Sequence, residues 1–246
     1  AGILNVTDIL EKKPSGLSGG HQQRVNLCRA LVREPNITLL DEPISHMDLR
    51  VRSNMRARIR RLHDDLKLTT IYVTHDQDEA VSLSDRIAVM NHAKLQQIGT
   101  VDEIWNHPVN KFVATFVGEP QMNFIQGAIE TPHEFSIPTK AGKMKFRFNG
   151  EVDGKYVGSE ITVGIRPMEI GLSDHNDRQT SIQGLVEIAE FQGESVILTV
   201  KLGDINGTEM KVAMGAEKMF KAGETVWMEF EPETIHLFDQ EPPILR

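Results

Sequence analysis

Residues 37–42 are the stretch that most directly indicates the fold class, and they read Ile37-Thr38-Leu39-Leu40-Asp41-Glu42. A short apolar run bounded by polar residues is typical of a strand buried in a parallel sheet. In α/β sheets, the carboxyl ends of such strands lie at the edge where ligands bind. We therefore expect Asp41 and Glu42 to stand at a functional edge of an α/β domain.

Helical and strand patterns alternate on both sides of this strand, which predicts an α/β domain. The predicted helices run from just after Gly20 to about Arg33, over about 49–66 and over about 101–106, and the further predicted strands cover 69–75 and 86–90. The apolar residues of the second helix recur at helical spacing on one face. Its six arginines are interpreted as a solvated face or a partner surface rather than as a nucleic-acid patch.

The character of the sequence changes near Gly118-Glu119-Pro120. Beyond this point, short alternating strands are separated by Gly, Pro, Asn and Asp, with little helical periodicity. This pattern predicts a small all-β domain of sandwich or barrel type. We therefore predict two domains, residues 1–119 and 120–246.

Composition limits the classes of function. The formal charge of −8 argues against general nucleic-acid binding, which needs a basic surface. No run of 18 or more apolar residues is present, so the chain itself is not expected to cross a membrane. The single cysteine, Cys28, excludes an intramolecular disulfide and fits a reducing compartment, where we expect it to be a small packed residue.

Ser18-Gly19-Gly20 opens the first predicted helix. Two glycines allow close approach of a ligand to the backbone, and the free N–H groups at the positive end of a helix suit a phosphate. A flexible Ser-Gly-Gly turn without a ligand has the same pattern. Taken alone, this segment leaves both interpretations open.

Two carboxylates and a histidine follow the predicted strands. Asp41 can orient Mg²⁺ through water, while Glu42 can polarise the water that attacks a γ-phosphate. His75, at the end of the next strand, can donate to that phosphate and orient the water. Each residue also has a structural interpretation, since acidic pairs often solvate loops, strand-end histidines are usually structural, and Asp48 can be a helix N-cap.

The order and spacing of these segments together resemble the nucleotide-binding subunits of ABC transporters. Leu17–His21 is similar to the signature motif, the strand ending at Asp41 and Glu42 to Walker B with its catalytic glutamate, Ser45–Asp48 to the D-loop, and His75 to the switch histidine. The resemblance implies ATP and Mg²⁺ as cofactors. It also implies roles for single residues: Glu42 and His75 in hydrolysis, Asp41 on Mg²⁺, and Leu17, Ser18, Gly19, Gly20, His21 and Asp48 on ATP.

Further segments resemble the ATPases of sugar importers of the maltose and glycerol-phosphate type. They are Asp76–Ala80, Asp85–Met90, Leu95–Thr100, Asn110–Ala114 and Met122–Phe124. Val163–Pro167 is similar to a motif of the C-terminal regulatory domain of that group, an OB-type (TOBE-like) barrel. The resemblance implies a partial P-loop NTPase domain followed by this barrel. It also implies a homodimer with a second ATPase subunit, transmembrane permease subunits, a regulatory protein on the barrel, no nucleic acid, and a location on the cytoplasmic face of the cell membrane.

The sequence departs from the family pattern in one large respect. It contains no Gly-x-x-x-x-Gly-Lys-Ser/Thr segment, the loop that cradles the phosphates, and only 17 residues precede Ser18. We therefore expect an N-terminally truncated member that is inactive alone, in which Ser18, Gly19 and Gly20 act on ATP held by a second subunit. Strands that would flank the Asp41 strand are missing too, so we expect uncovered apolar surface there.

Two single residues also differ from the pattern. His21 replaces the usual glutamine at the end of the signature, and Ala93 stands in the turn Asn91-His92-Ala93-Lys94 where glycine is common. An alanine at position 93 destabilises the fold if the turn needs a positive φ there.

Two alternatives for function remain open. The chain can serve an importer for another solute, such as a polyamine, ferric ion or sulfate, because no residue here sets the choice of solute. It can also be a non-catalytic module whose β-domain self-associates or captures a regulator.

Overall fold

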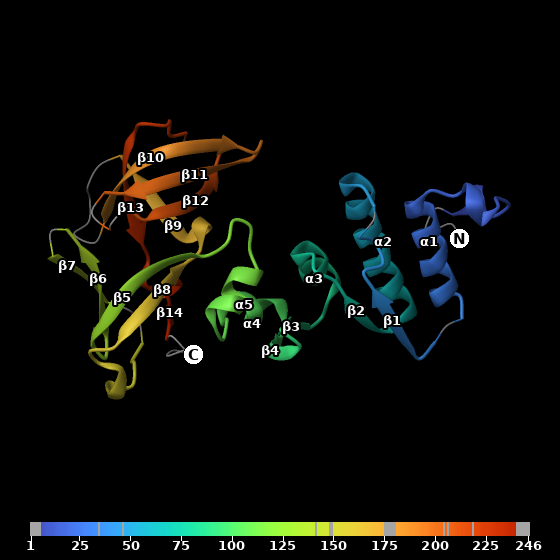
Figure 1. The fold of residues 1–246 in the computed structure, drawn as a ribbon, viewed down its shortest axis with the longest axis horizontal. Helices are drawn as coiled ribbons and strands as arrows, with labels where there is room; N and C mark the ends of the chain where they lie inside the picture. The colour runs from blue at the N-terminus through green and yellow to red at the C-terminus, as the bar shows by residue number, and fades with distance from the viewer. Residues whose placement is uncertain are drawn as a thin grey trace. The chain divides into compact units, whose positions relative to one another are not determined.

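The computed structural model describes residues 6–239 except 34, 46, 141, 148, 149, 175–180, 204, 206 and 218. It divides into two compact units, residues 1–87 and 88–246 (Figure 1). The predicted division into 1–119 and 120–246 concerns the change in sequence character, and it stays a prediction. Among the described residues, no helix is both long and apolar enough to span a membrane.

The first unit is a small α/β arrangement. Its elements are the 3-10 turns η1 (Thr7–Ile9) and η2 (Pro14–Gly16), helices α1 (Gly19–Leu31), α2 (Leu49–Leu66) and α3 (Gln77–Leu83), and strands β1 (Ile37–Asp41) and β2 (Thr69–Val73). The two strands are parallel, with Leu39 opposite Ile71 and Asp41 opposite Val73. The predicted alternation of helix and strand is therefore confirmed for this part of the chain.

The core of this unit lies between the helices and one face of the strand pair. Its buried apolar residues come from α1, from β1 and the loop after it, and from α2; they are Leu27, Leu31, Leu40, Ile44, Met47, Met55, Ile59 and Leu62. Each fully buried side chain of this kind stabilises the fold by about 1.5–3 kcal/mol. Cys28 is partly buried against the same cluster, which confirms its packing role, and this burial raises the pKa of its thiol.

The other face of the strand pair is uncovered. Leu39 and Ile71, which pair across the two strands, are 71% and 57% exposed, and Ile37 and Val73 are exposed on the same face. The uncovered apolar surface predicted beside the Asp41 strand is thus present. The buried parallel strand predicted over residues 37–40 is parallel as expected but is buried on one face only, because among the described residues helices lie over one face and alternate residues of β1 are exposed.

The second unit begins with a hairpin and two short helices. Strands β3 (Ile87–Asn91) and β4 (Lys94–Gly99) form a two-stranded sheet, followed by helices α4 (Val101–Asn106) and α5 (Lys111–Phe116). Thr100 and Glu103 form the predicted capping box at the start of α4. The hairpin turn places both His92 and Ala93 at positive φ, 46° and 60°.

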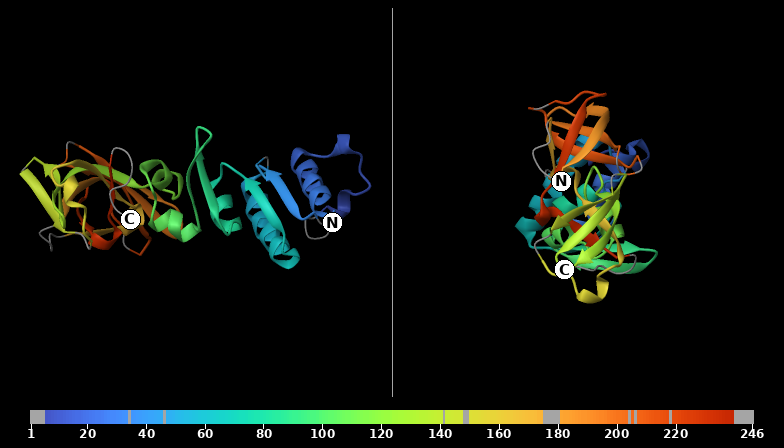
Figure 2. Two further views of the ribbon diagram at one scale, coloured as in Figure 1. Left: turned by 90° about the horizontal axis from the view of Figure 1, so that it is seen from below. Right: turned by 90° about the vertical axis from the view of Figure 1, so that its left-hand side faces the viewer.

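Two five-stranded antiparallel sheets make up the rest of this unit (Figures 1 and 2), which confirms the prediction of an all-β region. One has the order β14-β8-β5-β6-β7 and the other β12-β11-β10-β13-β9. The strands are β5 (Asn123–Thr131), β6 (Glu134–Thr139), β7 (Gly142–Arg147), β8 (Glu160–Ile165), β9 (Ile170–Ser173), β10 (Ile182–Phe191), β11 (Ser195–Leu202), β12 (Glu209–Gly215), β13 (Thr225–Phe230) and β14 (His236–Phe238), with 3-10 turns η3 (Gly154–Tyr156), η4 (Pro167–Glu169) and η5 (Pro232–Thr234).

The two sheets share one apolar core. Phe146 of β7 stacks on Phe135 of β6, with ring centroids 5.2 Å apart, and meets Phe230 of β13 edge-on at 6.0 Å. Since β7 and β13 belong to different sheets, this aromatic contact joins the two layers. Edge-on and offset aromatic pairs add about 0.5–1.5 kcal/mol beyond the area they bury.

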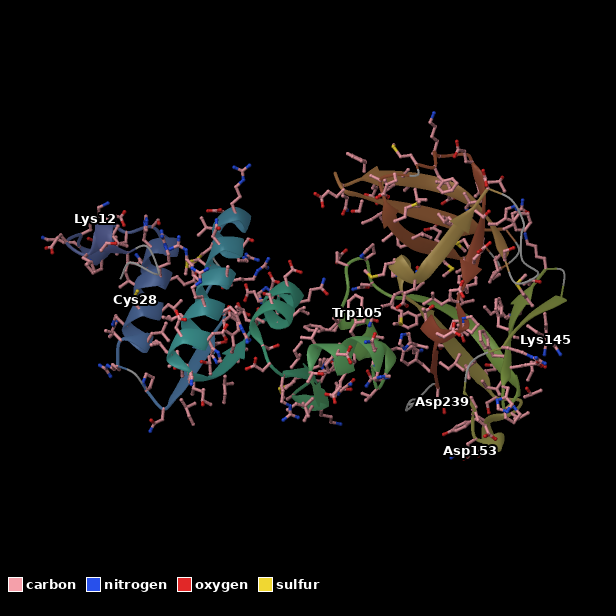
Figure 3. The ribbon with its side chains drawn as sticks, turned by 180° about the vertical axis from the view of Figure 1, so that it is seen from behind. Lys12, Cys28, Trp105, Lys145, Asp153 and Asp239 are labelled. Carbon is pink, nitrogen blue, oxygen red and sulfur yellow. The ribbon has the colours of Figure 1, made fainter. Side chains whose placement is uncertain are left out.

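Arg166, which directly follows β8, ties the short helices to the sheets. Its side chain is almost fully buried, and it donates to the carbonyls of Val117 and Trp105. The guanidinium lies 3.8 Å from the centre of the Trp105 ring. Trp105 belongs to α4 and is labelled in Figure 3. Residues 101–118 therefore pack as part of the second unit.

Candidate functional site

The predicted signature segment forms the start of α1. Ser18 is the N-cap, and its Oγ accepts a long hydrogen bond, 3.4 Å, from the His21 backbone N–H. The His21 ring reaches the same hydroxyl, with 2.8 Å between Nδ1 and Oγ. Leu17 lies just before the cap, and its carbonyl accepts a hydrogen bond from the Gln22 side chain. Ser18 and His21 are thus brought together at this helix end.

The two glycines of this segment are not required by the fold of the chain. A Cβ atom on Gly19 would meet nothing within 4 Å, and one on Gly20 would touch only Met47 Cγ, at 3.9 Å. Neither glycine has a positive φ. The absence of side chains therefore leaves open space at the N-terminus of α1, where N–H groups and the helix dipole favour an anion.

Glu42 stands where β1 ends, at a positive φ of 43°. Its N–H continues the strand pairing by donating to Val73 O, 2.9 Å away. Its carbonyl accepts hydrogen bonds from the side chains of Gln23 and Ser45, each at 3.0 Å. A left-handed conformation is unusual for a residue with a side chain and costs on the order of 1 kcal/mol, so these contacts hold a backbone that would otherwise relax.

Glu42 and His75 are in direct contact. Glu42 Oε1 lies 2.7 Å from His75 Nδ1, and both side chains remain open to solvent. The hydrogen bond that the His75 ring makes to the Glu42 carboxylate, together with the negative charge of Glu42, raises the pKa of His75 above its ordinary value. Two residues 33 positions apart therefore form one polar pair at the carboxyl ends of adjacent parallel strands.

A buried carboxylate supports the segment that carries His75. Glu79, in the first turn of α3, accepts hydrogen bonds from Tyr72 and Thr74 at 2.9 and 2.8 Å. Thr74 in turn accepts the N–H of Asp76 at 3.0 Å. Burial, followed by the charge of Glu79, raises the pKa of Tyr72 well above its usual range. This network fixes the backbone on both sides of His75.

The structure places the two remaining predicted residues in simpler surroundings. Asp48 is the N-cap of α2, where its carboxylate accepts the N–H of Val51 at 3.0 Å. Asp41 is exposed at the end of β1. His46, within the D-loop segment, lies outside the described residues. The Mg²⁺ and ATP roles of Asp41 and Asp48 stay predictions.

A complete protein cage for a metal ion is absent from the described part of the chain, where no three His, Cys, Asp or Glu residues gather. Mg²⁺ usually keeps several waters and binds through one or two carboxylates together with substrate phosphates. An exposed Asp41 at a strand end fits that kind of binding.

Sequence reasoning missed three residues of this region. Gln23 joins α1 to the backbone of Glu42, Glu79 anchors the strand before His75, and Arg52 contacts both loops. From the sequence, the arginines of α2 are expected to form a solvated or partner face. Three of them instead pair with acids at or beside α3, in the pairs Arg52–Asp76, Arg56–Asp78 and Arg60–Asp85. The four-residue spacing of these arginines was the available signal.

Three family models match the chain: the ABC transporter model over residues 2–45, the MalK OB fold domain over 118–170 and the TOBE domain over 163–238. The chain therefore combines a partial ABC transporter ATPase domain with OB-fold and TOBE β-domains.

Curated relatives agree with this assignment. The trehalose/maltose import ATP-binding protein MalK of Thermococcus litoralis is 41% identical over 250 residues, covering 98% of this chain and 65% of the relative. The xylose/arabinose import ATP-binding protein XacK of Haloferax volcanii is 36% identical, covering 97% and 62%. An uncharacterized ABC transporter ATP-binding protein of Bacillus subtilis, YurJ, is 37% identical, covering 98% and 66%. The chain thus spans slightly less than two-thirds of the length of these relatives.

Proposed function

We propose that this chain is part of the ATP-hydrolysing, energy-coupling subunit of an ABC importer for sugars or sugar phosphates. The observation that carries the proposal is the contact between Glu42 and His75 at the ends of two parallel strands. The names of the relatives, which import trehalose, maltose, xylose or arabinose, support the class of solute.

In this proposal, Glu42 and His75 divide the work on the attacking water. The Glu42 carboxylate accepts a hydrogen bond from the water and polarises it towards the γ-phosphate. In its protonated form, His75 donates from Nδ1 to Glu42 and from Nε2, on the opposite side of the ring, to the phosphate. Mg²⁺, held by Asp41 through water, would offset negative charge on the phosphates.

The start of α1 acts as a cap on the nucleotide. Gly19 and Gly20 present backbone N–H groups to the phosphates of an ATP molecule held on a second copy of the subunit, with Leu17, Ser18, His21 and Asp48 around it. The open space at Gly19 supports this role, because no described residue lies close enough to require a glycine there. A ligand or a partner that approaches the backbone closely would require a glycine at this position.

The phosphate loop is the part that these residues do not supply, since no Gly-x-x-x-x-Gly-Lys-Ser/Thr segment occurs among them. We propose that the 246 residues alone neither hold ATP nor hydrolyse it. A second ATPase subunit, membrane-embedded permease subunits and a regulator on the β-domain complete the assembly, at the cytoplasmic face of the membrane.

A chimera tests the function. A segment that carries the phosphate loop, taken from the Thermococcus litoralis relative, is joined ahead of residue 1, and ATP hydrolysis by this chimera is compared with that of the 246-residue chain. We expect activity in the chimera only, and a loss of about 10²–10⁴-fold with Glu42→Gln, the range for a general base. Glu11→Gln, an exposed glutamate of the same unit, is the matched control.

Two results would contradict the proposal. Hydrolysis that survives Glu42→Gln would show that another residue activates the water. Saturable ATP binding by the 246-residue chain would show that it holds phosphates without the loop.

A further inference from the structure

Arg52 bridges the two loops that carry the candidate site. From the first turn of α2, its Nη2 donates to the carbonyl oxygens of Ser45 and Met47, at 2.9 and 3.3 Å. Its Nη1 donates to Asp76 Oδ2 at 3.0 Å. Both side chains of the ion pair are about one-fifth exposed, so the bridge is partly shielded from water.

Each end of this bridge is connected to one member of the Glu42–His75 pair. Ser45 donates through both its N–H and its hydroxyl to the carbonyl of Glu42. Asp76 directly follows His75, and its other carboxylate oxygen caps α3 by accepting the N–H of Glu79. One guanidinium therefore joins the loop after Glu42 to the turn after His75.

The chemistry of arginine suits this arrangement. Its planar fork presents several donors in fixed directions, whereas the ammonium of a lysine is a single point charge. Burial alone would raise the pKa of Asp76, but hydrogen bonds from Glu79 N–H and Arg52 hold it below its ordinary value. Asp76 thus stays charged and keeps the fork in place at neutral pH.

Comparison with the neighbouring arginines of α2 distinguishes the contacts of Arg52 from those that only pack α2 against α3. Arg56 and Arg60 lie one and two turns further on and pair with Asp78 and Asp85, so they also hold α2 against α3 and the residues after it. Arg56 donates to Asp78, and Arg60 donates to Asp64, Asp85 and the carbonyl of Leu83. Removing Arg52 therefore leaves other ion pairs between these elements.

We propose that Arg52 is a positioning residue, which sets the separation of Glu42 and His75 by fixing the loop after Glu42 to Asp76. The inference rests on the proposed role of that pair in ATP hydrolysis. The contact between the two side chains can nevertheless be measured without nucleotide.

The first test uses the 246-residue chain and the ¹⁵N signals of the His75 ring at a fixed neutral pH. We expect Arg52→Ala to shift the Nδ1 signal away from its hydrogen-bonded position and Arg52→Lys to restore it only in part. Arg56→Ala, which removes an ion pair one turn along, should leave the signal unchanged. Thermal unfolding followed by circular dichroism verifies that each variant is folded.

A second variant acts from the other end of the bridge. Asp76→Asn can still cap α3, because asparagine is as good an N-cap as aspartate, but it loses the charge that Arg52 meets. We expect the same change in the His75 signal, with the double variant Arg52→Ala/Asp76→Asn no worse than either single one. This variant keeps the inference testable if Arg52→Ala does not fold.

In the active chimera, Arg52→Ala should lower kcat by about 10- to 100-fold with little change in KM, since misplacing catalytic groups by about 1 Å can cost about 10²-fold. A folded Arg52→Ala variant with an unchanged His75 signal would overturn the inference. An inactive wild-type chimera would instead count against the proposed function, and the change in the nucleotide-free signal would still support the positioning role.

Discussion

At the scale of single residues, the turn between β3 and β4 contains residues in a strained backbone conformation. His92 and Ala93 both adopt positive φ, the backbone that two-residue hairpin turns of type I′ need. Asparagine and glycine meet this need without strain, whereas an alanine pays about 1 kcal/mol for its Cβ. The cost predicted for Ala93 from the sequence is therefore real.

Replacing Ala93 with glycine should stabilise the protein by about 1 kcal/mol, because the strain of the left-handed conformation is removed. The matched change Ala57→Gly, on an exposed position of α2, should destabilise by a similar amount through loss of helix propensity. Urea denaturation measures both. Equal signs for the two changes would contradict the assignment of strain to the turn.

A substitution at Gly19 should affect nucleotide binding without affecting the stability of the fold. Since a Cβ there meets nothing, Gly19→Ala should leave the free energy of unfolding unchanged within about 0.5 kcal/mol. In the chimera, the same change should weaken ATP-driven association of two copies, measured by sedimentation, because the methyl group obstructs approach to the helix N-terminus. Gly16→Ala, also in open space but ahead of the helix, is the control. Normal association of Gly19→Ala would argue against the capping role.

At the scale of elements, Arg166 decides how α4 and α5 join the β-sheets. Burial lowers its pKa to about 10, so it stays charged at neutral pH while nearly hidden from water. The hydrogen bonds to two carbonyl groups and the contact with the Trp105 ring offset the hydration that the buried guanidinium loses. Gly118 fits beside it at a φ of 120°, where a Cβ would come within 3.2 Å of the guanidinium.

Arg166→Met should destabilise the second unit by about 3 kcal/mol or more, because hydrogen bonds from a charged donor contribute about 1.5–3 kcal/mol each. The fluorescence of Trp105 and Trp227, both in the second unit, reports the change in urea. Arg147→Met removes only a surface ion pair with Glu134, from a side chain that is 85% exposed, and should cost under about 1 kcal/mol. Similar losses for both would show that the Arg166 contacts contribute little.

His236 on β14 gives this unit a dependence on pH. Burial, then the charges of Arg166 and His107, lowers its pKa to about 4 from an ordinary value near 6.5. The unfolded chain therefore binds a proton more readily, and stability present above pH 6.5 falls as the pH drops towards 4. The loss amounts to at most about 3 kcal/mol.

Denaturation at a series of pH values between 4 and 7 measures the slope of the free energy of unfolding against pH. His236→Gln should flatten it, whereas His133→Gln, at an exposed histidine, should leave it in place. An unchanged slope in His236→Gln would assign the pH dependence to other groups.

At the scale of the whole molecule, the two compact units differ in the size of their cores. The core of the second unit is shared by two five-stranded sheets, while the first has a small cluster and a strand pair with one bare face. We expect residues 1–87 to unfold first, in a separate transition of scanning calorimetry, and to exchange their amide hydrogens faster. A single cooperative transition would contradict this.

The order of elements was predictable at this scale because its signals are local. The capping box at Thr100 and Glu103, the apolar spacing of α2 and the alternating strands after residue 120 each depend on neighbours in sequence. The burial expected for β1 is found on one face only, because burial depends on what lies on both faces of a strand. A run of apolar residues does not contain that information.

The sequence by itself determined the resemblance to ABC transporter ATPases, the α/β part followed by the all-β part, and the residue types at the candidate site, since motif spacing and periodicity are read along the chain. Only the tertiary structure decided which side chains meet: Glu42 with His75, Arg52 with Asp76, and Arg166 with Trp105. The partners are 33, 24 and 61 residues apart. Contacts over such separations arise from strand register and helix packing, and no local pattern specifies them.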